Sequence, residues 1–214
     1  MEESLLIKIC GMREPDNILA LSALEPDFIG FIFYPGSPRY AGDSINEIRS
    51  VICSSPAKKV GVFVNEPIEQ VKRITEILAL DRIQLHGDES PSYCQALHND
   101  GLKIIRAFRM HAEFDFRQTE AYAPSCRMFL FDTASASFGG SGEKFDWNIL
   151  QHYAGEVPFL LGGGISPEDA EKIKSFVHPA FAGIDLNSRF EKSPGVKDIA
   201  LLENFIRQIK SQGE

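Results

Sequence analysis

The feature that most constrains the fold is an eightfold alternation of short apolar runs with segments of helical spacing, repeated along 214 residues. The runs are rich in Ile, Val and Phe and predict strands, and the repeat of about 27 residues is near the lower limit for a strand–helix–strand unit. The predicted strands cover residues 5–11, 28–34, 59–65, 82–87, 103–109, 128–133, 157–161 and 181–186. Helices are predicted at residues 14–24, 44–52, 67–80, 90–98, 113–123, 146–153, 167–176 and 198–210.

Strict alternation of strand and helix predicts a parallel sheet covered by helices. An open doubly wound sheet is the alternative, but no predicted strand runs into a Gly-x-Gly-x-x-Gly turn. Eight near-equal units in an open sheet would also leave two edge strands with unpaired backbone groups, which a closed barrel removes. No charge run, Pro/Ser-rich linker or low-complexity tract divides the chain. We therefore expect an α/β fold, a single-domain (β/α)8 TIM barrel over residues 1–214.

Composition argues against several classes of function. The formal net charge of -8 and pI near 5.2 exclude nucleic acid and anionic membranes as expected partners, because both require a basic surface. No apolar run is long enough to span a bilayer, and the acidic start MEES lacks the basic region of a signal peptide, so a cytoplasmic location is expected. The four cysteines are widely spaced, which predicts reduced thiols rather than a zinc site or disulfides.

Polar residues stand at the predicted C-terminal ends of the strands, where barrels of this kind carry their active sites. They are Cys10, Tyr34, Asn65, His86, Asp132, Gly162, Gly163, Gly164, Asp185, Asn187 and Ser188. The glycines after the seventh strand let backbone N–H groups approach an anion, and Asn187 and Ser188 follow the eighth strand. A tight turn alone is the alternative reading of the glycines, but the two polar neighbours favour a phosphate site.

Two residues that can transfer protons flank this phosphate site. Period-two alternation points Lys8 and Cys10 into the barrel, and in the strand 128–133 it points Asp132 inward. Because closure brings the first strand beside the eighth, a bound sugar phosphate would lie between a thiol and a carboxyl group. An acid and a base on opposite sides of a substrate are typical of a proton-transferring isomerase. The alternative role for Cys10 is that of a small buried hydrophobe.

The same alternation places Lys8, Gln84, Arg106 and Asp185 inside the barrel. Unpaired interior charges are disfavoured, so we expect Asp185 to offset Lys8 or Arg106, or else to contact a sugar hydroxyl of the substrate. His86 also lies where the substrate binds. It is expected to be a satisfied polar residue at the mouth rather than a catalytic group.

Eight short motifs follow one another on this framework: KICG (8–11), GFIFYPGSPR (30–39), VGVFVN (60–65), QLHGDE (84–89), FDT (131–133), GGSGEKFDW (139–147), LGGGI (161–165) and SPGVKD (193–198). Together they resemble the phosphoribosylanthranilate isomerase family of tryptophan biosynthesis, over nearly the whole chain. The resemblance implies an Amadori rearrangement of N-(5-phosphoribosyl)anthranilate to 1-(2-carboxyphenylamino)-1-deoxyribulose 5-phosphate, with no cofactor and no metal. It implies a small phosphosugar substrate as partner, and a monomer or homodimer.

The resemblance also implies roles for individual residues. Asp132 would be the general acid that protonates the furanose ring oxygen, and Cys10 the general base that takes the proton from sugar C2. Their needs are opposite: the thiol pKa of ~8.5 must fall, helped by Lys8 or a loop cation, and the carboxyl pKa of ~3.9 must rise. Arg39 matches the family arginine that holds the anthranilate carboxylate, unless it is a solvated loop residue.

Some features depart from the family or leave alternatives open. The chain has Arg13 where the family usually has threonine, and Asn187 and Arg189 where it has serine and glycine, so Arg189 is strained if its backbone needs positive φ. Residues 134–144 form either a lid over the site or only a connection. A dual sugar isomerase, which carries aspartate in place of Cys10, and a phosphosugar-binding module without catalysis are the alternative functions.

Overall fold

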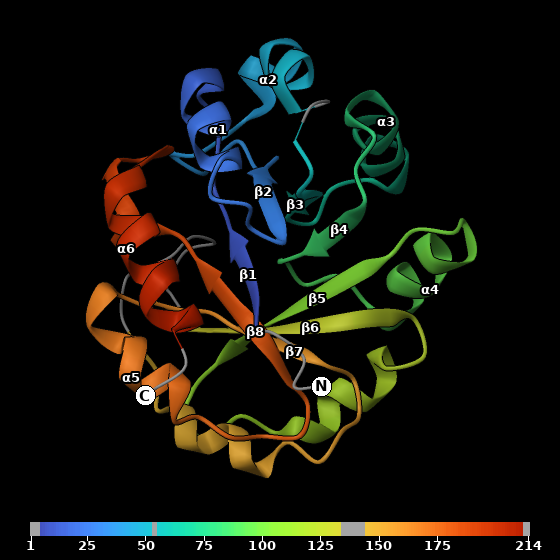
Figure 1. The fold of residues 1–214 in the computed structure, drawn as a ribbon. Helices are drawn as coiled ribbons and strands as arrows, with labels where there is room; N and C mark the ends of the chain where they lie inside the picture. Colours follow the sequence, from blue (N-terminus) through green and yellow to red (C-terminus); the bar gives the residue numbers. More distant parts are fainter. Residues whose placement is uncertain (1–4, 53–54, 134–143, 212–214) are drawn as a thin grey trace.

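The computed structural model describes residues 5–52, 55–133 and 144–211. Its eight parallel strands close into a barrel in sequence order, and the last strand pairs with the first (Figure 1). The strands are β1 (Leu6–Ile9), β2 (Phe28–Ile32), β3 (Lys58–Phe63), β4 (Arg82–Leu85), β5 (Ile104–Met110), β6 (Cys126–Thr133), β7 (Phe159–Leu161) and β8 (Phe181–Leu186). The predicted closed barrel is confirmed, and the open-sheet alternative is wrong.

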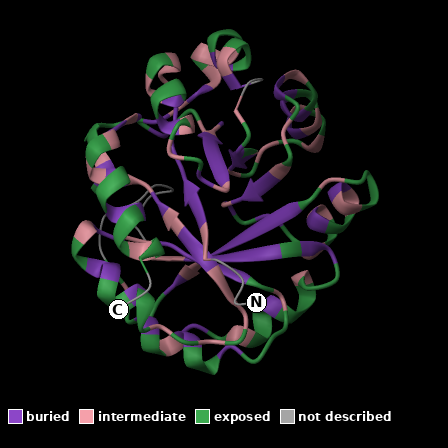
Figure 2. Cartoon of the chain, viewed as in Figure 1, coloured by how far each residue is buried: buried purple, intermediate pink, exposed green. Residues whose placement is uncertain are grey.

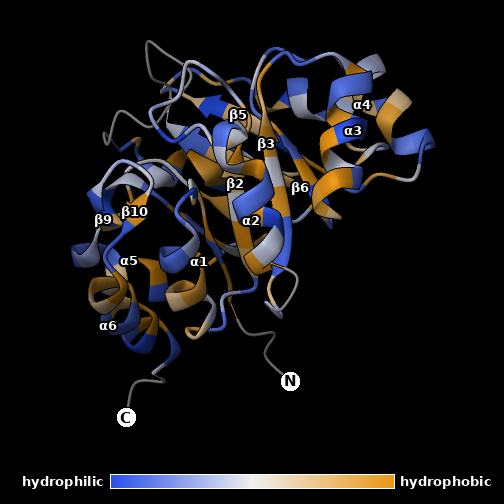
Figure 3. Cartoon of the chain, turned by 90° about the horizontal axis from the view of Figure 1, so that it is seen from above, coloured by the Kyte–Doolittle hydropathy of each residue, from blue (hydrophilic) through white to orange (hydrophobic). Residues whose placement is uncertain are grey.

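Helices surround the strands (Figure 1). They are α1 (Pro15–Ser22), α2 (Ile45–Ile52), α3 (Ile68–Leu78), α4 (Pro91–Asn99), α5 (Ala170–Lys174) and α6 (Ile199–Lys210). Most of each strand is buried and the outer sides of the helices are exposed (Figure 2), and apolar residues gather in the strands and on one side of each longer helix (Figure 3). Within the described ranges, every helix falls short of the length and apolar character that a membrane span requires.

Two segments predicted as α-helices form 3₁₀ turns instead, η2 (Phe116–Tyr122) and η3 (Trp147–His152). In η3 the buried residues Trp147 and Leu150, and Tyr153 just after it, are spaced by three. Because a 3₁₀ helix has three residues per turn, this spacing keeps all of them on one side. The α-helix prediction is wrong here because apolar residues three apart suit both kinds of helix over so short a segment.

The sheet separates two apolar clusters, as the alternation in β6 predicts. Met128 and Leu130 belong to the cluster inside the barrel, and Phe129 and Phe131 belong to the larger cluster between the sheet and the helices. The inner cluster fills the lower part of the barrel with Phe28, Val60, Ile105, Ala107, Met128, Leu130 and Leu160. The phase predicted for β6 is confirmed, so Asp132 continues the inward row.

The prediction that Arg106 points into the barrel is wrong. Its neighbours Ile105 and Ala107 belong to the inner cluster, so Arg106 lies on the outer face of β5. There its guanidinium donates to the backbone oxygen of Leu85 at 2.9 Å and pairs with Glu89 at 3.3 Å. Both faces of β5 carry apolar residues, so periodicity alone could not determine which face is inside.

Candidate active site

A cavity opens at the C-terminal ends of the strands. Nine of the ten residues predicted to bind or react with the substrate line it: Cys10, Arg39, His86, Asp132, Gly163, Gly164, Asp185, Asn187 and Ser188. Tyr34, predicted only to stand at a strand end, lines it as well. Residues from β1 and β6 thus meet in one space, although 122 positions separate Cys10 from Asp132 in the sequence. Of residues 134–144, predicted to form either a lid or only a connection, 134–143 lie outside the described part of the chain.

Among the strand-end residues predicted from the sequence, Asn65 and Gly162 do not line the cavity. Asn65 Oδ1 instead accepts from the backbone N–H of Asp88 at 2.7 Å, and Gly162 is bonded within the sheet. Its N–H donates to the backbone oxygen of Phe131 at 2.8 Å, so it is already used by the sheet. Gly163 and Gly164 line the cavity with φ of +82° and +66°. A Cβ on Gly163 would lie 2.2 Å from Thr133 Oγ1, so this turn requires glycine.

Arg189, in the loop after β8, carries no backbone strain. Asn187 and Ser188 line the cavity, and Ser188 begins the 3₁₀ turn η5 (Ser188–Phe190). Among the described non-glycine residues, positive φ occurs at Glu25, Asn65 and Ala79. Arg189 therefore replaces the family's glycine without entering the left-handed region.

Cys10 lies in a tight space at the end of β1 and is only 3% exposed. The neighbouring strand makes room for its thiol at Gly30, because a Cβ there would lie 2.8 Å from Cys10 Sγ. Burial raises the pKa of Cys10, and the charge of Lys8 offsets only part of that effect. The expectation of a lowered thiol pKa is therefore wrong, because a buried thiolate loses more solvation than one ammonium group restores.

Lys8 and Asp185 form the ion pair expected inside the barrel, with Lys8 Nζ 2.9 Å from Asp185 Oδ1. The two residues are register partners on β1 and β8, which sets their side chains against each other. Burial alone would lower the pKa of Lys8, but the charge and hydrogen bond of Asp185 raise it above the ordinary value. Burial raises the pKa of Asp185, against the effect of Lys8. Asp185 thus both offsets Lys8, as predicted, and lines the cavity.

His86 connects Asp132 to the interior layer. His86 Nε2 lies 3.3 Å from Asp132 Oδ2, and Gln84 Nε2 lies 2.9 Å from His86 Nδ1. An amide nitrogen can only donate, so Gln84 placed in this way leaves Nε2 to carry the ring proton and face Asp132. His86 is therefore a satisfied residue at the cavity mouth, as expected, and it orients the Asp132 carboxyl group.

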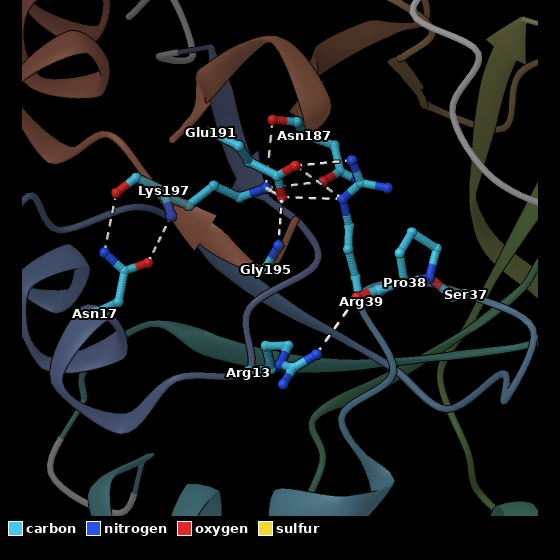
Figure 4. A network of polar contacts seen from close by, with 9 residues as sticks. All are labelled: Arg13, Asn17, Ser37, Pro38, Arg39, Asn187, Glu191, Gly195 and Lys197. Atoms are coloured by element: carbon cyan, nitrogen blue, oxygen red, sulfur yellow. Dashed lines mark hydrogen bonds and ion pairs between the residues drawn. The ribbon is translucent and has the colours of Figure 1, made fainter. Parts of the chain in front are cut away.

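Arg39 is buried, 8% exposed, and is not the solvated loop residue of the alternative reading. Its guanidinium pairs with Glu191, with Nη2 2.7 Å from Oε2, and Glu191 Oε1 also accepts from Lys197 Nζ at 2.7 Å (Figure 4). Burial alone would raise the pKa of Glu191, but its contacts with Arg39 and Lys197 hold it below the ordinary value. Burial lowers the pKa of Lys197.

Sequence reasoning missed Glu191 and Lys197 as parts of this site. They belong to a short antiparallel hairpin after β8, formed by β9 (Glu191–Ser193) and β10 (Val196–Lys197), where only a turn was expected. The signal was present: opposite charges flank the Pro-Gly turn of the SPGVKD motif. The pairing could not be predicted because Arg39, which contacts Glu191, is 152 positions away from it in the sequence.

Comparison with known proteins places this site in a family. The family model for N-(5'-phosphoribosyl)anthranilate (PRA) isomerase matches residues 7–208. The N-(5'-phosphoribosyl)anthranilate isomerase of Parabacteroides distasonis is 51% identical over 207 residues, covering 96% of this chain and 93% of that protein. The crystal structure of phosphoribosyl anthranilate isomerase from Thermotoga maritima is 31% identical, with a TM-score of 0.85 and coverage of 96% and 98%.

A further solved structure shows such an isomerase in complex with reduced 1-(o-carboxyphenylamino)-1-deoxyribulose 5-phosphate. It is 28% identical to this chain, with a TM-score of 0.81 and coverage of 96% of this chain and 98% of that one. The family match spans more than half of the chain and agrees with the motifs and with the cavity they build. The chain belongs to the N-(5'-phosphoribosyl)anthranilate isomerase family.

Proposed function

We propose that this chain catalyses the isomerisation of N-(5'-phosphoribosyl)anthranilate in tryptophan biosynthesis, with Asp132 as general acid and Cys10 as general base. The observation that carries the proposal is that both groups line one cavity, at the ends of β6 and β1. The two strands that lie between them, β7 and β8, are followed by Gly163 and Gly164 and by Asn187. A phosphosugar held at those ends would extend between the carboxyl and the thiol.

The reaction divides into two proton transfers. Asp132 donates a proton to the furanose ring oxygen while the anthranilate nitrogen pushes the ring open to a Schiff base. Cys10 then removes the proton from sugar C2, and the resulting enolamine tautomerises to the ketone product. His86, 3.3 Å from Asp132, orients the acid. Lys8, two residues before Cys10, opposes part of the effect of burial on the pKa of the base, and the charge of Asp185 acts in the other direction.

The remaining cavity residues fit the two charged ends of the substrate. Gly163, Gly164, Asn187 and Ser188 would bind the phosphate, and Arg39 would bind the anthranilate carboxylate through a charge-assisted contact. Asp185, with an exposed edge in the cavity, suits a sugar hydroxyl. The reduced product in the related complex carries the same phosphate and carboxylate, which supports this arrangement.

The direct test is turnover of freshly generated N-(5'-phosphoribosyl)anthranilate by the purified protein. Loss of the substrate's fluorescence should follow the enzyme concentration and saturate with substrate. If the protein binds the reduced product but does not consume the substrate, the proposal fails in favour of a phosphosugar-binding module.

Replacing Arg39 by methionine is expected to raise KM by about ten- to a hundredfold, with a much smaller change in kcat. A hydrogen bond to a charged group contributes about 1.5–3 kcal/mol, and the methionine removes the cation that would meet the carboxylate. Steady-state kinetics separates the two parameters, and thermal unfolding checks the fold. Arg39→Lys keeps the charge but loses the planar guanidinium, so its KM should lie between those of the native protein and Arg39→Met. An unchanged KM in Arg39→Met would remove Arg39 from the substrate site.

The pH profile of kcat/KM is expected to be bell-shaped, because the reactive form needs a proton on Asp132 and none on Cys10. At low pH the thiol keeps its proton and the base is lost, and at high pH both protons are lost and the acid is missing. Carboxyl groups ordinarily release their protons at lower pH than thiols. The acid limb of the profile therefore falls at the carboxyl pKa, and the alkaline limb falls at the pKa of Cys10. Because burial raises the pKa of this thiol, that limb should lie above about 8.5.

The ultraviolet absorbance of the thiolate, as the difference between the native protein and Cys10→Ser, measures the same ionisation directly. The two measurements should give the same midpoint. An alkaline limb whose midpoint does not match the midpoint of the thiolate absorbance contradicts the assignment of this pair.

Two properties of the chain remain predictions. A solved structure of the Thermotoga maritima enzyme is described as a monomer generated from a dimeric isomerase, and for this chain we infer a monomer or homodimer. We also infer a cytoplasmic location, where a biosynthetic enzyme acting on a phosphorylated sugar meets its substrate.

A further inference from the structure

Glu191 accepts hydrogen bonds from the Nε–Nη2 edge of the Arg39 guanidinium and leaves the edge that carries Nη1 open to a ligand. Arg39 Nε lies 2.9 Å from Glu191 Oε1 and 3.0 Å from Oε2, and Nη2 lies 2.7 Å from Oε2. The third nitrogen, Nη1, points away from Glu191 (Figure 4). Because Arg39 lines the cavity and a guanidinium is planar, fixing the Nε–Nη2 edge also fixes the direction in which Nη1 donates.

The ion pair between Arg39 and Glu191 is largely shielded from water. The side chains of Arg39 and Glu191 are 10% and 4% exposed, and that of Lys197 is fully buried. Ion pairs on the surface hold their side chains weakly, because water competes for both partners. A bidentate pair away from water, with a second cation on the same carboxylate, restricts the Arg39 rotamer much more strongly.

The charges of this cluster leave one positive charge for a ligand. Arg39 and Lys197 are cations and Glu191 is an anion, so the three carry a formal charge of +1 beside the cavity. Lys197 Nζ also donates to Asn187 Oδ1 at 2.8 Å. Glu191 therefore neutralises one cation but does not cancel the attraction for an anionic ligand. Lys197 connects the Arg39–Glu191 pair to Asn187, a residue at the phosphate end of the cavity.

A glycine at position 11 leaves the space that the Arg39 and Asn187 side chains occupy. Gly11, next to Cys10, has φ of +81°, and a Cβ there would lie 2.7 Å from Arg39 Cδ and 2.8 Å from Asn187 Oδ1. Any other residue at this position would push against both side chains. Close contact with Gly11 and hydrogen bonds to Glu191 therefore both restrict the position of the Arg39 side chain.

We propose that Glu191 is a positioning residue that aims the open edge of Arg39 at the carboxylate of the substrate, and so makes the site selective for the carboxylated aniline. This inference rests on the proposed function of Arg39 and adds the residue that gives it direction. It predicts that losing Glu191 affects recognition of the carboxylate and not of the phosphosugar. A purely structural role of the ion pair predicts equal losses for all ligands.

The test compares two ligands by calorimetry: the reduced product, 1-(2-carboxyphenylamino)-1-deoxyribitol 5-phosphate, and its analogue with phenyl in place of 2-carboxyphenyl. Glu191→Gln should weaken the carboxylated ligand about tenfold or more, and the analogue less than twofold. Arg39→Met should produce the same selectivity loss. The double variant should lose no more selectivity than Arg39→Met alone, because one residue acts through the other.

The matched control is Glu89→Gln, which removes the buried carboxylate that pairs with Arg106 outside the cavity. It should leave the ratio of the two dissociation constants unchanged. If Glu191→Gln does not fold, Glu191→Asp supplies the same comparison, since the shorter carboxylate cannot reach both guanidinium nitrogens from the same backbone position.

Each result separates this inference from the proposed function. If Arg39→Met loses carboxylate selectivity and both Glu191 variants keep it, positioning by Glu191 is overturned and the role of Arg39 stands. Equal weakening of both ligands in the Glu191 variants also overturns it, in favour of a structural role. If Arg39→Met keeps its selectivity, the assigned role of Arg39 fails first and the inference fails with it.

Discussion

Asp132→Asn is expected to lower kcat by about three orders of magnitude while the protein keeps its fold. General acid catalysis contributes about 10²–10⁴-fold, and an amide of the same shape has no proton to give to the ring oxygen. The asparagine can still accept from His86 Nε2, which lies 3.3 Å from Asp132 Oδ2, so the geometry of the site should survive. Single-turnover measurement of fluorescence loss gives the rate of the chemical step.

The control for Asp132→Asn is the affinity for the reduced product, which should change by less than about threefold because no proton is transferred on binding. His86→Gln is a graded comparison, since it removes only the group that orients the acid, and it should cost less than Asp132→Asn. Turnover of Asp132→Asn within tenfold of the native rate would remove Asp132 as the general acid.

Cys10→Ala is expected to lower kcat by about 10²–10⁴-fold, because it deletes the base that takes the proton from C2. The space it leaves is small, since the thiol is already enclosed against Gly30. Cys10→Ser should be nearly as inactive, because its hydroxyl does not ionise in the accessible pH range. The reduced product should still bind to both variants.

The Cys10 and Asp132 variants should stop the reaction at different points. With Cys10→Ala, ring opening by Asp132 still proceeds, and a Schiff base accumulates that cyanoborohydride reduces to the amino-ribitol phosphate. With Asp132→Asn, ring opening itself is blocked and little reduced material forms above the uncatalysed level. If Cys10→Ala yields no more trapped Schiff base than Asp132→Asn, the two residues do not act in the order proposed.

Residues whose position depends on a strong local pattern were predictable. In β6 one face is formed by Phe129 and Phe131 and the other ends in Asp132, so the phase of the strand could be read directly. In β5 both faces are apolar, and Arg106 was placed on the wrong side. The short segment that begins at Trp147 is a 3₁₀ turn and not the predicted α-helix, because apolar residues three apart fit both helix types.

The sequence by itself determined the number and order of the strands, the closure of the barrel and the chain positions of Cys10, Asp132 and Arg39, because all of these follow from local periodicity and motif order. Only the tertiary structure decided the partners and the electrostatics. It paired Arg39 with Glu191 across 152 positions, withdrew Gly162 from the cavity, and raised the pKa of Cys10. The physical reason is that burial, solvation and charge pairing depend on which distant side chains share a space, and no periodic pattern along one segment carries that information.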